Sequence, residues 1–136
     1  MSKIMALDLG DQWVGVALSD ASRIFPKPYT TVTAADLEQF LSDIIKKETI
    51  EIIVIGYPKT MSGRESDQTK KVVNYKELLQ TKFPDKQFVL WDERLSSKRA
   101  QTVGPNKSKE DKLKSHAIAA AFILDSYLGF LHMTSK

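Results

Sequence analysis

Short apolar runs bounded by turn residues open this sequence. Residues 4–9 are almost entirely apolar and are followed by a glycine, which is typical of a buried strand that ends in a tight turn. Residues 13–19 alternate apolar and small side chains, as in a second strand paired with the first. A third strand is expected within residues 24–32. Its two prolines restrict it to a sheet edge, because proline cannot donate to the hydrogen-bond ladder.

Helical spacing begins after this third strand. Residues 33–36 resemble a capping box, and the apolar positions that follow predict a helix that ends near Glu48. The β-branched run at residues 51–55 predicts a buried strand that Gly56 ends. A second helix is expected to end near Lys82, and a fifth strand is expected at residues 87–91.

The remaining segments complete an α/β pattern. Residues 59–67 are polar and predict a loop, residues 97–101 a short helix, and residues 111–131 a long closing helix. Three strands followed by helix, strand, helix, strand and helix predict a mixed five-stranded sheet with helices on both faces. The length of 136 residues fits one domain, residues 1–136.

Composition narrows the class of protein. Hydrophobic residues make up 42% and charged residues 27%, which is usual for globular chains. The absence of cysteine excludes disulfides and thiol catalysis. The longest uninterrupted apolar stretch, residues 117–124, is shorter than the roughly 20 residues of a membrane span, and no signal pattern precedes the first strand. We therefore expect a cytoplasmic protein without a membrane partner.

Positive charge is concentrated near the C-terminal end. The net charge of +3 is compatible with a polyanionic partner but does not identify one. The basic residues of this region are Lys98, Arg99, Lys107, Lys109, Lys112 and Lys114. A charge run of this kind alone usually forms a solvated loop and helix face.

Asp8 is the most informative residue for chemistry. Period-two counting places it on the same strand face as Ile4 and Ala6, and an ionised carboxylate among apolar neighbours is costly unless something compensates it. A metal ion would compensate it. The alternative is that Asp8 caps the turn at Gly10 or lies on a solvated edge.

A second acidic signal follows the fifth predicted strand. Asp92, Glu93 and Arg94 stand at its carboxyl end, where ligands gather in open α/β sheets. Consecutive residues of an extended chain point in opposite directions, so one acid is expected to face Asp8, and Glu93 has the longer reach. The alternative is that Asp92 or Glu93 pairs with Arg94 or caps the next helix. Converging carboxylates can hold Mg²⁺ or Mn²⁺ for phosphodiester hydrolysis.

Four segments in order along the chain together resemble a known family. They are residues 6–10 with 14–20, residues 54–58 with 61–63, residues 91–97, and residues 119–124. Together they are similar to the YqgF family of pre-16S ribosomal RNA processing nucleases and Holliday-junction resolvases. The resemblance implies an RNase H-like fold, a nuclease activity and metal ligands at Asp8 and Glu93. It also implies a loop that contains Gly56, Pro58 and Gly63.

His116 departs from the family pattern. A third acid normally begins the closing helix in this family, and His116 stands in its place. A neutral imidazole can ligate Mn²⁺ but suits Mg²⁺ poorly. Asp111 lies five residues earlier, too far around a helix to replace it. His116 is therefore a ligand, a general base or an inert residue, and the sequence leaves these open.

Basic residues gain a role beside such a site. Arg94 and Lys98 are expected near the scissile phosphate, and Lys107, Lys109 and Lys114 near flanking phosphates. We expect recognition by shape, either of structured RNA such as the 5′ end of pre-16S rRNA or of a branched DNA junction. Both monomer and homodimer stay open.

Two other functions compete with the nuclease. Asp8, Leu9 and Gly10 also fit the first phosphate loop of an actin- or hexokinase-type phosphotransferase, but that class needs a second phosphate loop and usually a second domain. The other rival is a non-catalytic RNA-binding protein on a nuclease scaffold, which the replacement at His116 favours.

Overall fold

Five strands form one mixed sheet in the order β3-β2-β1-β4-β5. The computed structural model describes residues 2–10, 12–57, 67–92 and 109–134. The strands are β1 (Lys3–Leu9), β2 (Trp13–Ser19), β3 (Pro26–Thr33), β4 (Ile50–Tyr57) and β5 (Gln87–Asp92). β1 pairs antiparallel with β2 and parallel with β4, so the central strand joins an antiparallel half to a parallel half.

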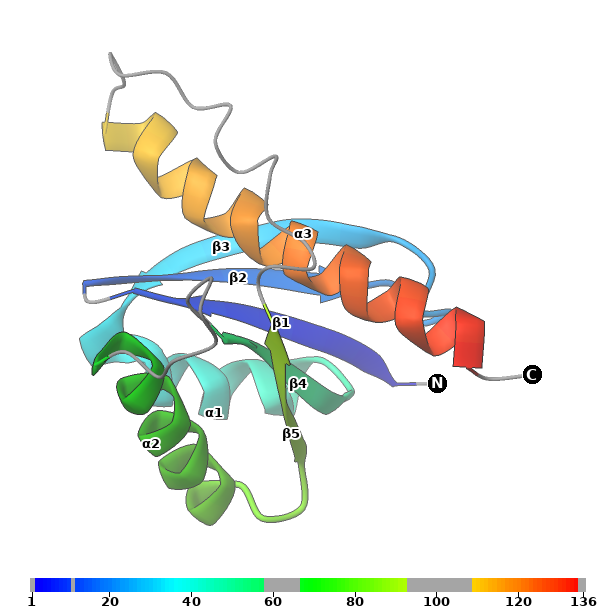
Figure 1. Ribbon diagram of the computed structural model, residues 1–136, viewed down its shortest axis with the longest axis horizontal. Coiled ribbons are helices and arrows are strands. Elements are labelled where there is room, and N and C mark those ends of the chain that lie inside the picture. The colour runs from blue at the N-terminus through cyan, green and yellow to red at the C-terminus, as the bar shows by residue number, and fades with distance from the viewer. Residues whose placement is uncertain (1, 11, 58–66, 93–108, 135–136) are drawn as a thin grey trace.

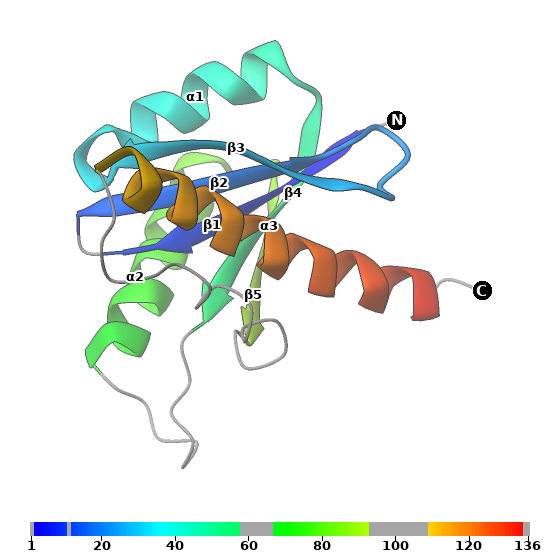
Figure 2. The same ribbon diagram turned by 90° about the horizontal axis from the view of Figure 1, so that it is seen from above.

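Helices cover both faces of this sheet. They are η1 (Ala34–Asp36), α1 (Leu37–Lys47), α2 (Asp67–Lys82) and α3 (Lys109–Thr134). α3 crosses one face, while α1 and α2 lie over the other (Figure 1). In the view from above, α3 runs across the front of the strands (Figure 2). The expected mixed α/β sheet with helices on both faces is confirmed.

The apolar run of β1 is continuous because both of its faces are buried. Met5 and Leu7 belong to the hydrophobic cluster on the side of α1 and α2. Ile4 and Ala6 belong to the cluster that also contains the buried residues of α3. Alternate residues of one strand therefore contribute to two separate cores.

Most predicted elements are confirmed, with shifts at their ends. β3 is an edge strand, as its prolines predict. The Thr33 side chain accepts a hydrogen bond from the Asp36 N–H, but this cap starts the short helix η1 and α1 follows it. Asp67, expected in a loop, is the first residue of α2. α3 is longer than expected at both ends. Residues 58–66 and the short helix expected at residues 97–101 lie outside the described residues.

α3 has the length and composition of a membrane-spanning helix, contrary to the expectation from uninterrupted apolar runs. Leu113–Thr134 has a mean hydropathy of 1.4, because an average over a window tolerates single polar residues. In the structure this helix lies over the sheet, where its residues Ala120, Ile123 and Leu124 are buried. A helix that packs in a protein core passes the same test of length and composition, so this property does not indicate a membrane protein by itself.

Candidate active site

Asp8 lies near the carboxyl end of the central strand, on the face that α3 covers. It is half-buried and follows Ile4 and Ala6, which pack in the cluster on the α3 side. Its partner across the antiparallel ladder is Gly15 of β2. Directly paired residues of an antiparallel ladder point to the same face. The expected position of Asp8 is thus confirmed, although its chemical role stays a prediction.

Gly15 brings the backbone of α3 down onto the sheet beside Asp8. A Cβ atom at position 15 would lie 1.9 Å from the carbonyl oxygen of His116 and 2.9 Å from the nitrogen of Ala117. Only glycine permits this approach. The strand pair Asp8–Gly15 and the helix residue His116 therefore meet at one place.

His116 lies on the face of α3 that packs against the sheet. Ala120 and Ile123 are buried in the cluster on this side. His116 precedes them by four and seven residues, which places all three on one helix face. His116 itself is half-buried, and helical side chains lean toward the N-terminus of their helix. The structure therefore places His116 on the side of α3 that faces Asp8, and its role stays a prediction.

A second glycine adjoins Asp8 in the parallel half of the sheet. Ala6 pairs with Val54 and Leu7 with Ile55, so the register brings Gly56 next to Asp8. The neighbours of Asp8 in both adjacent strands thus lack side chains. Gly56 lies within β4, so the prediction that it belongs to a loop is wrong, because the strand continues to Tyr57. Pro58 and Gly63 are outside the described residues.

β5 decides which of the two neighbouring acids shares a face with Asp8. Phe88 and Leu90 pack in the cluster on the side of α1 and α2, whereas Val89 and Trp91 pack on the α3 side. Alternation therefore directs Asp92 to the face opposite Asp8. Glu93, the expected metal ligand, comes next in the sequence and lies outside the part of the chain that the structure describes.

Asp8 suits a hard divalent cation, because its carboxylate supplies oxygen ligands and glycines adjoin it on both sides. Among the described residues, no three His, Cys, Asp or Glu side chains form a group that could hold a metal ion. A complete coordination sphere would therefore require ligands beyond this described set, such as Glu93 and substrate oxygens.

The predicted phosphate contacts are only partly within the described structure. Arg94, Lys98 and Lys107 lie outside it, and Lys109 is the first residue of α3. Lys114 is exposed and lines a cavity of about 470 Å³ between β3 and α3, together with Thr31, Leu113 and Ile118. Neither Asp8 nor His116 lines that cavity.

Sequence reasoning overlooked Gly15. Its signal was a glycine in the interior of an otherwise apolar strand, which often marks the close approach of another backbone. The segment that approaches it lies about 100 residues later in the chain, so the sequence did not identify the contact.

Comparisons with known proteins cover almost the whole chain. A family model described as "RuvX: Holliday junction resolvase" matches residues 2–129. A protein of Amoebophilus asiaticus named "Putative pre-16S rRNA nuclease" is 37% identical over 133 residues, 94% of each chain. A protein of Thermoanaerobacter pseudethanolicus with the same name is 35% identical over 93% of this chain and 95% of its own.

A solved structure has the same fold at low identity. T. thermophilus RuvC, in complex with a Holliday junction substrate, superimposes with a TM-score of 0.60 at 10% identity, covering 98% of this chain and 96% of that one. This likeness confirms the expected RNase H-like fold.

Proposed function

This chain belongs to the RuvX family, the family expected under the name YqgF, and we propose that it is a metal-dependent endonuclease of structured nucleic acid. One observation carries the proposal: the half-buried Asp8 lies across the ladder from Gly15, and Gly15 is where the backbone of α3 at His116 comes down onto the sheet. Family membership favours this activity over a phosphotransferase.

Asp8 and Glu93 are the residues that would hold Mg²⁺ or Mn²⁺. The bound ion would relieve the repulsion between the carboxylates and lower the pKa of a water molecule for attack on phosphorus. The exclusion of Asp92 from the face of Asp8 supports Glu93 as the second ligand. Glu93 follows Trp91 by two residues, and Trp91 packs on the α3 side.

The protein side of the reaction follows from the positions of the described residues. Because the glycines beside Asp8 have no side chains, a phosphate group can approach the carboxylate closely. His116 lies above this face of the sheet, where its imidazole takes up the proton that the attacking water releases. Arg94 and Lys98 follow Glu93 closely in the chain, and we assign them to the charge of the scissile phosphate.

We propose the 5′ end of pre-16S rRNA as the substrate. The relatives that are more than 30% identical over nearly their full length carry the name of pre-16S rRNA nucleases, which favours RNA. The description of the family model and the junction complex of RuvC favour a four-way DNA junction as the second candidate. Both substrates are structured polyanions, and the basic C-terminal region suits either. Such a role places the protein in the cytoplasm.

A cleavage assay with matched acid variants tests this function. Wild-type protein with Mn²⁺ or Mg²⁺ should cut a pre-16S rRNA 5′ fragment, and Asp8→Asn and Glu93→Gln should each abolish cutting while binding persists. Asp92→Asn is the matched control, because Asp92 belongs to the opposite face of the sheet and its loss should leave cleavage intact. A four-way DNA junction, tested in parallel, separates the two substrates.

The same assay can refute the proposal. Cleavage that survives in Asp8→Asn would show that the catalytic site is elsewhere. Binding without cleavage in any metal would instead identify a non-catalytic RNA-binding protein. Circular dichroism of each variant ensures that lost activity is not lost folding.

A further inference from the structure

A concave site lies at the end of β1, on the face opposite Asp8. It has a volume of about 440 Å³ and lies between α2 and the carboxyl end of β1. We call it the Tyr75 pocket; its lining residues are Leu9, Gly10, Ala34, Lys71, Val72, Asn74, Tyr75 and Leu78. Leu9, Val72 and Tyr75 belong to or pack against the core on the side of α1 and α2. The wall of this pocket is therefore formed by residues that pack in or against the hydrophobic core.

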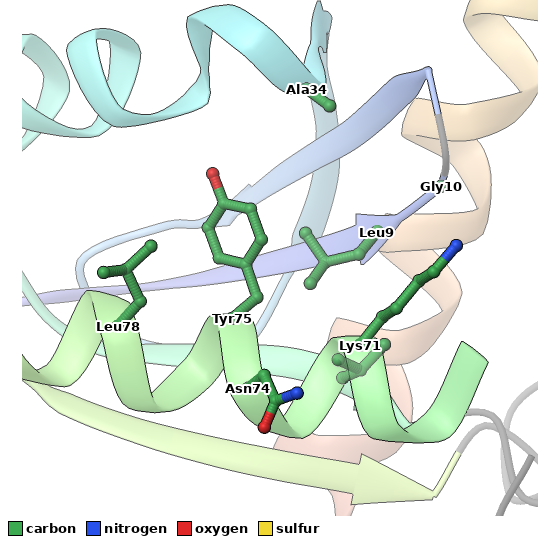
Figure 3. A pocket seen from close by; sticks show the side chains of 8 residues that line it. Leu9, Gly10, Ala34, Lys71, Asn74, Tyr75 and Leu78 are labelled. Carbon is green, nitrogen blue, oxygen red and sulfur yellow. The ribbon is translucent and has the colours of Figure 1, made fainter. Parts of the chain in front are cut away.

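The pocket combines a flat apolar wall with a cation. Figure 3 shows the ring of Tyr75 between Leu78 and Leu9, and the side chain of Lys71 reaching toward Gly10. Burial, with a smaller contribution from the charge of Glu38, raises the pKa of Tyr75, so its ring stays neutral at ordinary pH. The Glu38 carboxylate is itself paired with Lys82 at 2.6 Å, which limits its repulsion of an anion. A planar aromatic ligand with an anionic group fits this arrangement.

At Gly10 the chain connects the Asp8 site, on one face of β1, with the Tyr75 pocket on the other face. Asp8 points to the α3 side, and Leu9 lines the Tyr75 pocket on the other side. Gly10 follows directly and lines the pocket without a side chain. Strand geometry separates residues 8 and 10 by only about 7 Å. A nucleic acid strand that leaves the Asp8 site can therefore pass over Gly10 into the pocket.

We propose that the Tyr75 pocket binds a nucleotide of the substrate strand, next to the one that carries the scissile phosphate. The base stacks on Tyr75 and a phosphate pairs with Lys71, which is the combination that single-stranded nucleic acid sites commonly use. The assignment to the substrate strand rests on the proposed nuclease function. Nucleotide binding itself does not rest on it, so the two can be tested apart.

Titration with a mononucleotide tests the pocket without any cleavage. AMP should shift the methyl NMR signals of Leu9, Val72 and Leu78, and adenosine should bind more weakly because it lacks the phosphate. Tyr75→Leu should abolish the shifts, whereas Tyr29→Leu, a tyrosine outside the pocket, should leave them unchanged. Lys71→Met should remove the advantage of AMP over adenosine. Lys70→Met, the neighbouring lysine that does not line the pocket, should keep it.

RNA binding then identifies the source of the nucleotide. With Asp8→Asn as the uncleaving background, Tyr75→Leu should weaken the Kd for a structured RNA by roughly 5- to 100-fold, as expected for one lost stacking contact. Inorganic phosphate should not reproduce the AMP shifts. An unchanged RNA Kd, with AMP shifts intact in the wild type, would overturn the substrate-strand assignment and identify a site for free nucleotides. Absence of AMP shifts would overturn the pocket, whatever the cleavage assay shows.

Discussion

Gly15 of β2 and His116 of α3 are in backbone contact, since a Cβ atom at position 15 would lie 1.9 Å from the carbonyl oxygen of His116. This contact fixes the height of α3 above the sheet beside Asp8, near the carboxyl end of β1. The small residues Ala17 and Ala120, buried in the same cluster, continue the close approach along the helix. The candidate active site therefore depends on the lack of a side chain at position 15.

Substitution of Gly15 by alanine should destabilise the protein and displace α3. The nearest neighbours of the added methyl group are backbone atoms, which cannot change rotamer to make room. Overpacking of this kind costs about 1–3 kcal/mol, and occasionally more. Urea denaturation should show the lower free energy of unfolding. The rate of nucleic acid cleavage should fall by more than the loss of folded protein explains, because His116 moves relative to Asp8.

Gly129 supplies the matched control within α3. A Cβ atom there meets nothing within 4 Å, and the residue is exposed. Gly129→Ala should therefore raise the free energy of unfolding by roughly 0.5–1 kcal/mol, because alanine is the better helix former. A Gly15→Ala variant that is as stable as the wild type would show that α3 does not pack this closely on β2 in solution.

Much of the fold follows from the sequence because its apolar periods are regular. The buried β1 and β4 appear as continuous apolar runs, and the prolines of β3 place it at an edge. The exact ends of helices are harder to predict, as at Asp67, because a polar residue can either extend a loop or begin a helix. The face of Asp8 was predictable from strand alternation alone.

The site was predictable only in part. Alternation predicts that only one of Asp92 and Glu93 faces Asp8, but the face of Asp92 follows from the packing of Phe88 and Leu90 on the side of α1 and α2. The meeting of Gly15 with His116 is different, because no local pattern pairs residues that are about 100 positions apart. The Tyr75 pocket also escaped prediction, since it depends on how α2 lies beside Gly10.

Acid stability should depend on Asp20, which organises the turn between β2 and β3. Its Oδ1 atom accepts the N–H groups of Ile24 at 2.8 Å and Phe25 at 2.9 Å, and its Oδ2 atom accepts the Ser22 hydroxyl. These hydrogen bonds, that from Ser22 first, lower the pKa of Asp20 well below its ordinary value of 3.8. Because the pKa of Asp20 is depressed in the folded protein, its carboxylate stabilises the fold at pH values above 3.8, and this contribution is lost as the pH falls below 3.8.

Thermal unfolding of Asp20→Asn should show this dependence. The variant should have a lower Tm than the wild type near neutral pH, and the difference should shrink as the pH falls below about 4. Asp125→Asn, which removes an exposed carboxylate of α3, is the control and should show no such trend. A difference between Asp20→Asn and wild type that stays constant with pH would contradict the assigned cause.

Trp91 should couple the end of β5 to α3. Its Nε1–H donates to the Ser126 hydroxyl at 3.0 Å, and its ring meets Tyr127 edge-on with centroids 5.3 Å apart. Ser126→Ala should cost about 0.5–1.5 kcal/mol in the wild type, the usual contribution of one hydrogen bond. The same change should cost almost nothing in a Trp91→Phe background. A double-mutant cycle by urea denaturation measures the coupling, and a value near zero would mean that the bond is not formed in solution.

His116 should decide both the rate and the metal preference of the nuclease. If its imidazole takes the proton from water, His116→Ala should slow cleavage by roughly 10²- to 10⁴-fold, with little change in RNA binding. His116→Asp supplies the acid that the family resemblance predicts at this position, and should shift the preference from Mn²⁺ toward Mg²⁺, since carboxylate oxygen suits Mg²⁺ better than imidazole does. His132, the other histidine of the chain, lies in the last turn of α3, where it hydrogen-bonds the backbone oxygen of Arg23. His132→Ala is the control and should retain the wild-type pH–rate profile. Full activity of His116→Ala would show that the residue is inert and that Asp8 and Glu93 suffice.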